Sequence, residues 1–280
     1  MKVRQELETS LASDGPEIPS RGVLGVRVDS TTYQGASELI ASWASARQSR
    51  YVCVANVNNV MEAHDDPAYM AVMNDADLVT SDGMPLVWAL RMQGIDGAER
   101  VYGPTLTAEF CAEAERRDIS VGFFGGSPEV LSAMIDQIKT RWPRLRIAYQ
   151  ESPPFRPLSA EEDAAVISAI NASGAQVLFV GLGAPKQERW MAEHVGSVRA
   201  VMVGVGAAFD YLAGAKRQAP MLAQRAGFEW LFRLATEPKR LWKRYAKHNP
   251  RFVFLFTRQL IQRRRRSKET LRATREEAGR

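Results

Sequence analysis

The chain has 280 residues, 45% of them hydrophobic, which is enough for one large α/β domain with an appendage. No stretch approaches the roughly 18 uninterrupted apolar residues of a membrane-spanning helix. Cys53 and Cys111 lack metal-ligand spacing and are expected to be buried thiols of a reducing compartment. Residues 216–280 hold 19 Lys/Arg against 5 Asp/Glu, whereas residues 1–215 hold 18 against 27. The basic tail is therefore expected to meet a polyanion, either a membrane surface or a nucleic acid.

Strand-like and helix-like segments alternate along the chain. Residues 1–21 are polar, are interrupted by glycine and proline, and are expected to form a disordered lead-in. Strands are predicted at residues 23–28, 51–54, 76–80, 119–124, 145–150, 176–180 and 200–205. Helices are predicted at residues 34–47, 57–64, 67–74, 85–92, 105–117, 128–142, 160–172 and 185–194. This alternation predicts a Rossmann-like α/β domain over residues 22–215, with a mostly parallel sheet covered by helices, and a basic helical C-terminal appendage over residues 216–280.

A carboxylate directly follows the strand predicted at residues 76–80. Asp82 lies in the polar turn Ser81-Asp82-Gly83, and Pro85 suits the first turn of the next helix. Ligands of open α/β sheets bind outside the carboxyl ends of the strands, so Asp82 is expected to face the ligand. The alternative is that Asp82 only caps the helix.

Three turns after predicted strands are rich in small residues, at positions 125–127, 181–185 and 204–207. Backbone N–H groups of such turns bind phosphate, which predicts a nucleotide or sugar-phosphate ligand, although small residues also permit tight packing. The turn at 204–207 lacks the third glycine of the dinucleotide fingerprint, which argues against an oxidoreductase. Asp75 and Asp77 form a D-x-D pattern, but they precede a strand and are interpreted as solvated loop acids rather than metal ligands.

From residue 24 to residue 245 the chain resembles the WecG/TagA/CpsF family of bacterial glycosyltransferases. The resemblance is carried by Ala55-Asn-Val-Asn58, by residues 76–83, 99–104 and 123–126, by Gly181-Leu-Gly-Ala-Pro-Lys-Gln-Glu188, and by residues 204–210 and 238–245. It implies inverting transfer of an N-acetylmannosamine-like sugar or another hexose from a UDP-sugar to a polyprenyl-diphosphate-linked sugar in cell-surface polysaccharide synthesis. It also implies that no metal or other cofactor is needed. The enzyme is then expected to be a peripheral protein on the cytoplasmic face of the cell membrane. Whether it forms a homo-oligomer is left open.

The resemblance assigns roles to particular residues. Asp82 matches the family's presumed general base, which takes the proton of the acceptor hydroxyl. Without a metal, the departing UDP is expected to be stabilised by N–H groups of the glycine turns and by cations such as Arg100 or Lys186. Many family members have Thr where this chain has Val54, and Asp where it has Thr105. The predicted donor-site residues are Asn56, Asn58, Gly83, Arg100, Gly103, Thr105, Gly125, Gly126, Gly183, Pro185, Lys186, Gln187, Glu188 and Asp210.

Three polar members of that set have a simpler reading beside the functional one. Asn56 is expected either to orient a sugar hydroxyl or to form a turn, and Lys186 either to contact UDP or to lie on the surface. Asp210 is expected either to hold the uridine or to cap a helix.

The basic tail has its own pattern. Residues 227–263 alternate apolar and basic residues at helical spacing, as in an interfacial helix that lies on a membrane. One side is expected to carry Leu231, Leu234, Leu241, Trp242 and Tyr245, and the other Arg233, Arg240, Arg244, Lys247 and Arg251. Contact with the lipid diphosphate and an anionic membrane is predicted for Arg233, Arg240, Arg244 and Arg251.

Two alternatives to this membrane role are open. The tail can instead be a helix packed on the core with a solvated basic face. A nucleotide-binding α/β protein with a nucleic-acid-binding tail is a second functional class. It is disfavoured because the body is acidic and no nucleic-acid module is recognised, so nucleic acid is not expected as a partner.

Overall fold

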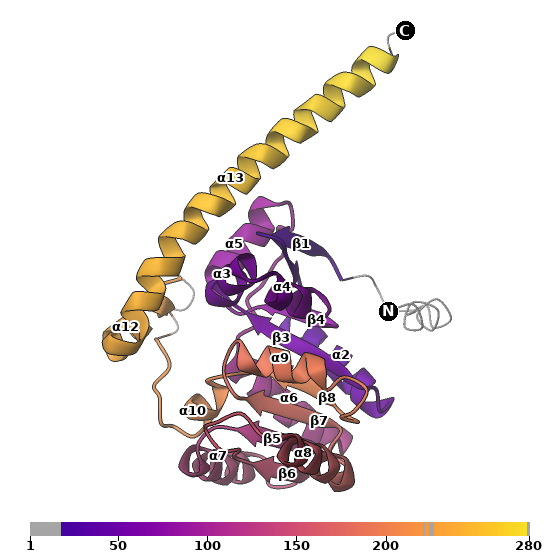
Figure 1. Cartoon of the computed structure of the whole chain (residues 1–280), viewed down its shortest axis with the longest axis vertical. Coiled ribbons are helices and arrows are strands. Elements are labelled where there is room, and N and C mark those ends of the chain that lie inside the picture. The colour runs from indigo at the N-terminus through magenta and orange to yellow at the C-terminus, as the bar shows by residue number, and fades with distance from the viewer. Residues whose placement is uncertain (1–17, 221, 224–226, 279–280) are drawn as a thin grey trace.

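The computed structural model shows an α/β body and a long helix that extends beyond it (Figure 1). It describes residues 18–220, 222–223 and 227–278, but not the side chains of Arg240 and residues 266–278. Most of the predicted lead-in, residues 1–17, lies outside the described residues. The division of the chain at residues 215 and 216 stays a prediction.

A parallel sheet of six strands forms the centre of the body, in the order β4-β3-β8-β7-β5-β6. The strands are β3 (Arg50–Ala55), β4 (Leu78–Ser81), β5 (Val121–Gly125), β6 (Ile147–Glu151), β7 (Val177–Gly181) and β8 (Val201–Gly204). The predicted Rossmann-like α/β fold with a basic C-terminal helix is therefore confirmed.

Both faces of the sheet are buried, which explains the continuous apolar character of its strands. Along β3, Tyr51 and Cys53 belong to one hydrophobic cluster, whereas Val52 and Val54 belong to the other. The first cluster includes residues of α3 (Val57–Asp65), α4 (Pro67–Asn74), α5 (Met84–Met92), α8 (Ala160–Ser173) and α9 (Lys186–Glu193). The second includes residues of α2 (Tyr33–Ser45), α6 (Gly103–Arg117), α7 (Pro128–Arg141) and α10 (Ala208–Leu212). Strand register brings Ala55 opposite Ser81 and Cys53 opposite Gly204, so the loops after β3, β4 and β8 emerge at the same edge.

The single strand predicted at residues 23–28 is wrong. The chain instead forms an antiparallel hairpin of β1 (Ser20–Val23) and β2 (Val26–Asp29) outside the main sheet. Leu24 and Gly25 both have positive φ, at 51° and 97°, which is the backbone of a tight two-residue hairpin turn. The Asp29 carboxylate accepts the N–H of Val79 at 2.7 Å and so ties the hairpin to β4.

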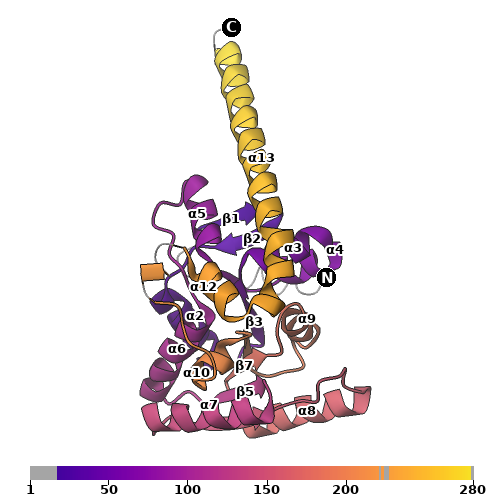
Figure 2. The same cartoon turned by 90° about the vertical axis from the view of Figure 1, so that its left-hand side faces the viewer.

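Two helices follow the body, α12 (Glu229–Thr236) and α13 (Pro238–Ala278). The first part of α13 lies along α3 and the hairpin, and the rest continues past the body (Figure 2). Phe252 and Phe256 are buried in the first hydrophobic cluster. The Gln259 side chain accepts the N–H of Leu24 at 2.8 Å and donates to the carbonyl of Gly22 at 2.7 Å. None of the helices in the described ranges combines the length and apolar character that crossing a membrane requires.

The predicted sides of the tail helix are partly wrong. Leu241 is fully buried whereas Trp242 is 52% exposed, so these two residues do not share a face. Arg233 and Arg244, expected on an outer basic face, line cavities of the body instead. Leu241 and Trp242 are consecutive in α13 and so lie 100° apart around it. The chain also turns between α12 and α13, so one helical wheel does not describe residues 227–263.

Candidate active site

Asp82 lies at the carboxyl end of β4, where its backbone N–H donates to the carbonyl of Ala55 at 2.8 Å. The helix that follows is capped by Gly83, with no side-chain hydrogen bond at the cap. The alternative reading of Asp82 as a helix cap is therefore not what the structure shows. Its side chain is only 15% exposed and lines two adjoining cavities. Burial raises the pKa of Asp82 to about 6, an effect that nearby Arg100 offsets and nearby Glu229 reinforces.

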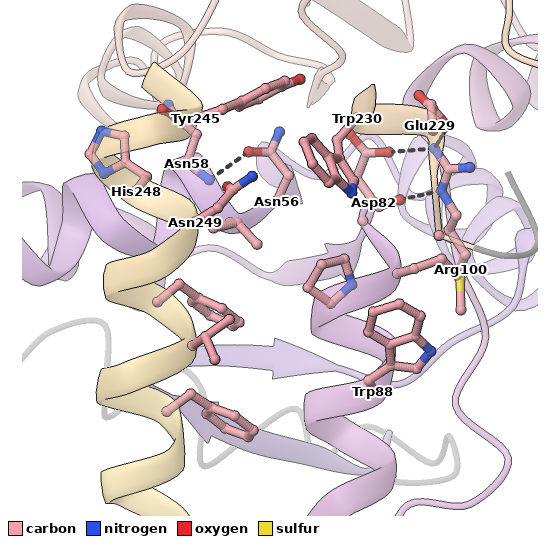
Figure 3. A pocket seen from close by; sticks show the side chains of 18 of the residues that line it. Asn56, Asn58, Asp82, Trp88, Arg100, Glu229, Trp230, Tyr245, His248 and Asn249 are labelled. Carbon is pink, nitrogen blue, oxygen red and sulfur yellow. Dashed lines mark hydrogen bonds and ion pairs between the residues drawn. The ribbon is translucent and has the colours of Figure 1, made fainter. Parts of the chain in front are cut away.

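Arg100 stands beside Asp82 because the loop between α5 and α6 runs along the end of β4. Val101 N–H donates to the carbonyl of Ser81 at 2.9 Å, and Ser81 Oγ donates to the carbonyl of Glu99 at 2.8 Å. Arg100 Nε donates to the backbone carbonyl of Asp82. Its Nη2 lies 3.4 Å from Asp82 Oδ1 and 2.5 Å from Glu229 Oε2, so one guanidinium group serves two carboxylates (Figure 3).

The smaller cavity, of about 170 Å³, is polar and lies at the carboxyl edge of the sheet. Its floor comes from the loops after β3, β4, β7 and β8, represented by Asn56, Asp82, Gly183 and Gly206. Asn56 accepts the N–H of Asn58 at 2.9 Å as the N-cap of α3, so it is a structural cap and a cavity residue at once.

The larger cavity, of about 430 Å³, is a mostly apolar groove between α5 and α13 (Figure 3). Its apolar lining residues are Val57, Met84, Pro85, Trp88, Met92, Trp230, Tyr245, Phe252, Val253, Phe256 and Leu260. The polar end of the groove meets the smaller cavity, and the five residues common to both are Asn56, Asn58, Asp82, Arg233 and Arg244. We call these five residues the shared wall.

Two arginines of the tail contribute to the shared wall. Arg233 comes from α12 and lies 5.9 Å over the ring of Tyr211, and Arg244 comes from α13 and lies 5.7 Å over the ring of Tyr245. Their Nε atoms are buried without a hydrogen-bond partner in the part of the chain that the structure describes. Arg244 and Arg233 thus offer unused donors suited to an anionic ligand such as a diphosphate.

A buried network beneath the smaller cavity joins three of its loops. Gln187 Oε1 accepts the N–H groups of Gly183 at 3.1 Å and Gly206 at 3.0 Å. Gln187 Nε2 donates to Glu188 Oε1 at 2.9 Å. Asn59 Nδ2 also reaches Glu188 Oε1, at 3.3 Å, and Asn59 Oδ1 accepts the N–H of Asn56 at 3.2 Å. The pair Gln187 and Glu188 therefore holds the loops in position, and burial raises the pKa of Glu188.

Several predicted donor-site residues do not line either cavity. Glu188 is fully buried, and Asp210 pairs with Lys216 at 3.4 Å. Gly125 and Gly126 pack against the neighbouring turn, where Gly126 N–H donates to the carbonyl of Gly181 at 3.2 Å. The full set outside the cavity linings is Gly103, Thr105, Gly125, Gly126, Pro185, Lys186, Glu188 and Asp210.

Two other predicted residues have structural partners. Arg251 pairs with Asp65 of α3 at 2.6 Å and so helps to attach α13 to the body. Asp77 is not a solvated loop acid as predicted, because it pairs with Arg50 at 2.6 Å and its side chain is 7% exposed. The side chain of Arg240 lies outside the described residues. Cys53 and Cys111 are buried free thiols, as expected.

The sequence reasoning missed residues that the structure brings to the site. Glu229, Trp230, His248 and Asn249 line the groove, and Tyr102 and Tyr211 line the smaller cavity. A hint for Tyr102 was its place between Arg100 and the helix-starting Gly103-Pro104 pair. Tyr211 belongs to α10 and directly follows the predicted Asp210. The other four belong to the tail, and no local pattern indicated that the tail folds back onto the carboxyl edge.

The fold and cleft define a Rossmann-like α/β protein whose active-site cleft has a polar and an apolar compartment, with a buried carboxylate between them. Residues 21–266 match the model of the glycosyl transferase WecG/TagA/CpsF family, so the chain belongs to that family. It is therefore a glycosyltransferase with a sugar donor and an acceptor, and the family implies a role in cell-surface polysaccharide synthesis. The match includes α12 and the first part of α13, so the tail that completes the cleft is part of the family pattern.

Proposed function

We propose that the protein transfers a sugar from a UDP-sugar to a polyprenyl-diphosphate-linked sugar, with inversion at the anomeric carbon. Asp82 accepts the proton of the acceptor hydroxyl, the hydroxyl oxygen bonds to the anomeric carbon, and the bond from that carbon to UDP breaks. A carboxylate with a pKa raised to about 6 by burial suits this step, since it is ionised near neutral pH and a stronger base than an exposed aspartate.

The observation that carries this proposal is the position of Asp82 in the shared wall. On one side is a polar cavity enclosed by strand-end loops, which suits a nucleotide sugar. On the other is an apolar groove with a polar end, which suits a lipid-linked acceptor whose sugar reaches the wall. A base for inverting transfer has to stand between donor and acceptor.

The positive charge for the departing UDP is proposed to come from Arg233 and Arg244. Of the cations expected from the sequence, Arg100 is engaged by Asp82 and Glu229, and Lys186 lines neither cavity. Arg233 and Arg244 line both cavities and have buried Nε donors available, which supports this assignment.

We further propose that transfer is metal-independent. Among the described residues no three His, Cys, Asp or Glu side chains are grouped as metal ligands would be. The D-x-D pair gives no support to a metal either, because Asp77 is committed to Arg50. Activity should therefore survive an excess of chelator.

Membrane contact is proposed for the outer face of α13, on the cytoplasmic side of the membrane. At 100° per residue, that face lies opposite the buried Leu241, Phe252 and Phe256. It carries the exposed apolar side chains of Phe254 and Ile261, and around them the exposed basic residues Lys243, Lys247, Arg258, Arg264 and Arg265. Apolar residues interleaved with basic ones on one exposed face favour an anionic bilayer surface.

A donor panel tests the proposed function. Full-length protein in detergent would be offered UDP-N-acetylmannosamine, UDP-N-acetylglucosamine, UDP-glucose and UDP-galactose, with polyprenyl-diphosphate N-acetylglucosamine as acceptor. The expected result is one donor that releases UDP only when the acceptor is present and gives a longer lipid-linked glycan. Acceptor-independent hydrolysis of every donor, or no turnover with any of them, would contradict the proposal.

A further inference from the structure

Glu229 is a tail residue in direct contact with the machinery around Asp82. It begins α12, its side chain is 13% exposed, and it lines the apolar groove but not the polar cavity. Its Oε2 lies 2.5 Å from Arg100 Nη2, the same nitrogen that lies 3.4 Å from Asp82 Oδ1. The shared nitrogen is thus much closer to the tail carboxylate than to the proposed base.

The longer distance from Arg100 to Asp82 affects how well Asp82 can act as a base. A carboxylate in close contact with a guanidinium holds its charge firmly and takes up a proton poorly. Arg100 is fixed near Asp82 by its Nε contact with the Asp82 backbone carbonyl and by its position 4.2 Å over the ring of Tyr102. With Arg100 fixed in this way, the competing carboxylate is what draws Nη2 away from Asp82.

We propose that Glu229 is a positioning residue that holds Arg100 off Asp82 and so keeps Asp82 strong enough to act as the base. The inference rests on the proposed function, in which Asp82 is the base. It goes beyond that function in naming a tail residue that sets the strength of the base.

The segment just before α12 packs closely against the body. Gly227, just before the helix, has φ +77°, and a Cβ there would lie 2.6 Å from the Trp88 ring. Gly227 therefore packs closely on α5, and this close packing brings Glu229 to Arg100. Trp230, one residue further, lines the same groove (Figure 3).

Other charged and titratable groups also surround Asp82 and have to be held constant. The charge of Arg233 of α12 lowers the pKa of Asp82, and Arg244 of α13 belongs to the same shared wall. Tyr33 of α2 and Tyr102 before α6 are further neighbours on the body side. His248 of α13 lines the groove. A useful variant therefore changes the Glu229 charge and leaves these five side chains in place.

The test is the pH profile of kcat for Glu229→Gln in the full-length chain. UDP-N-acetylmannosamine, or the donor that the panel selects, would be used with polyprenyl-diphosphate N-acetylglucosamine. Arg100 should close on Asp82, so the acid limb should move to lower pH by about one unit, since a charge at this distance shifts a carboxyl pKa by one to three units. Turnover on the plateau should fall about three- to tenfold because the base is weaker, with KM for the donor unchanged.

Two matched variants separate this role from simple attachment of the tail. Glu229→Asp keeps the charge and should keep the acid limb where it is in the wild type. Asp65→Asn breaks the Arg251 ion pair, which also attaches the tail to the body, and should not move the limb. If Glu229→Gln does not melt cooperatively, Glu229→Ser replaces it with the same expectation.

An acid limb that stays in place in a folded Glu229→Gln protein would overturn the inference, as would an equal shift in Asp65→Asn. The Asp82→Asn protein distinguishes a failure of the Glu229 role from a failure of the proposed function. If it is inactive while Glu229→Gln leaves the limb unmoved, only the role of Glu229 fails. If Asp82→Asn transfers sugar at the wild-type rate, the proposed function fails with it.

Discussion

At the scale of single residues, Asp82 combines burial with access to both cavities. Because burial raises its pKa to about 6, the carboxylate is largely ionised at pH 7 and becomes protonated as the pH falls through 6. A protonated Asp82 cannot accept the acceptor's proton. We therefore expect kcat/KM to fall about tenfold per pH unit below 6, with a one-proton slope in a pH–rate profile. A profile that is flat down to pH 4.5 would contradict this assignment.

Arg233 and Arg244 are the residues whose charge should matter most for the departing UDP. Each arginine replaced by Gln should lower kcat about 100-fold, the typical loss when one donor to a developing negative charge is removed. The readout is the rate of UDP release with a saturating donor. Arg146→Gln is the matched control, because Arg146 is an exposed arginine just before β6, is paired with Asp118, and should leave kcat unchanged. Equal losses in all three variants would indicate an effect of net charge rather than of position.

The residues of the site differ in how far the sequence could predict them. Asp82 was predictable because it lies in the turn between a strand and a proline-started helix. In a parallel sheet such a turn lies at the carboxyl edge, where ligands bind. Its pairing with Arg100 and Glu229 was not, because no local rule says that α12 returns to the end of β4. For the same reason Arg233 and Arg244 were predicted to contact the lipid diphosphate and the membrane, and their place in the cleft wall was not foreseen.

At the scale of elements, the glycine turns differ in function although they look alike in sequence. Gly125 has φ +130°, and a Cβ there would lie 2.5 Å from the backbone carbon of Gly181. Gly183 has φ +79° but nothing within 4 Å of a Cβ. We expect Gly125→Ala to lower the free energy of unfolding by about 3 kcal/mol or more, from strain plus the clash, and Gly183→Ala by about 1 kcal/mol. Urea unfolding of both proteins tests this, and equal losses would show that the close approach of the two turns does not matter.

Helix starts could be predicted where a capping residue marks them. Ser127 caps α7 by accepting the N–H of Val130 at 3.3 Å, as the Ser-Pro pair predicts. The hairpin was missed because Leu24 and Gly25 lie within an alternating apolar pattern that reads as one strand. Leu24 at φ 51° is an uncommon backbone for a leucine, and tertiary packing rather than propensity selects it.

At the scale of the whole molecule, α13 has an inner face that packs on the body and an outer face that is exposed. Phe252 is 5% exposed and Phe254 is 67% exposed, two residues apart on the same helix. Phe252→Ala should cost about 3 kcal/mol of unfolding free energy, since a buried phenylalanine is replaced by a cavity. Phe254→Ala should change that free energy by less than about 0.5 kcal/mol. Thermal or urea melts of the two proteins give the comparison.

The same pair tests the membrane proposal. Sedimentation with vesicles rich in anionic lipid should show severalfold weaker binding for Phe254→Ala than for the wild type. Raising the salt should weaken both, because the neighbouring basic residues contribute about 1 kcal/mol each near an anionic surface. Binding that is equal for the two proteins and insensitive to salt would contradict the outer face of α13 as the membrane contact.

The central claim is that Asp82 is the base for sugar transfer, and Asp82→Asn tests it most directly. The amide has nearly the same shape but cannot accept the proton, so the folded variant should lose about 100- to 10,000-fold in single-turnover transfer from the UDP-sugar to the lipid-linked acceptor. Donor binding, measured separately by calorimetry, should change little. An Asp82→Asn protein that transfers sugar at the wild-type rate would contradict the account.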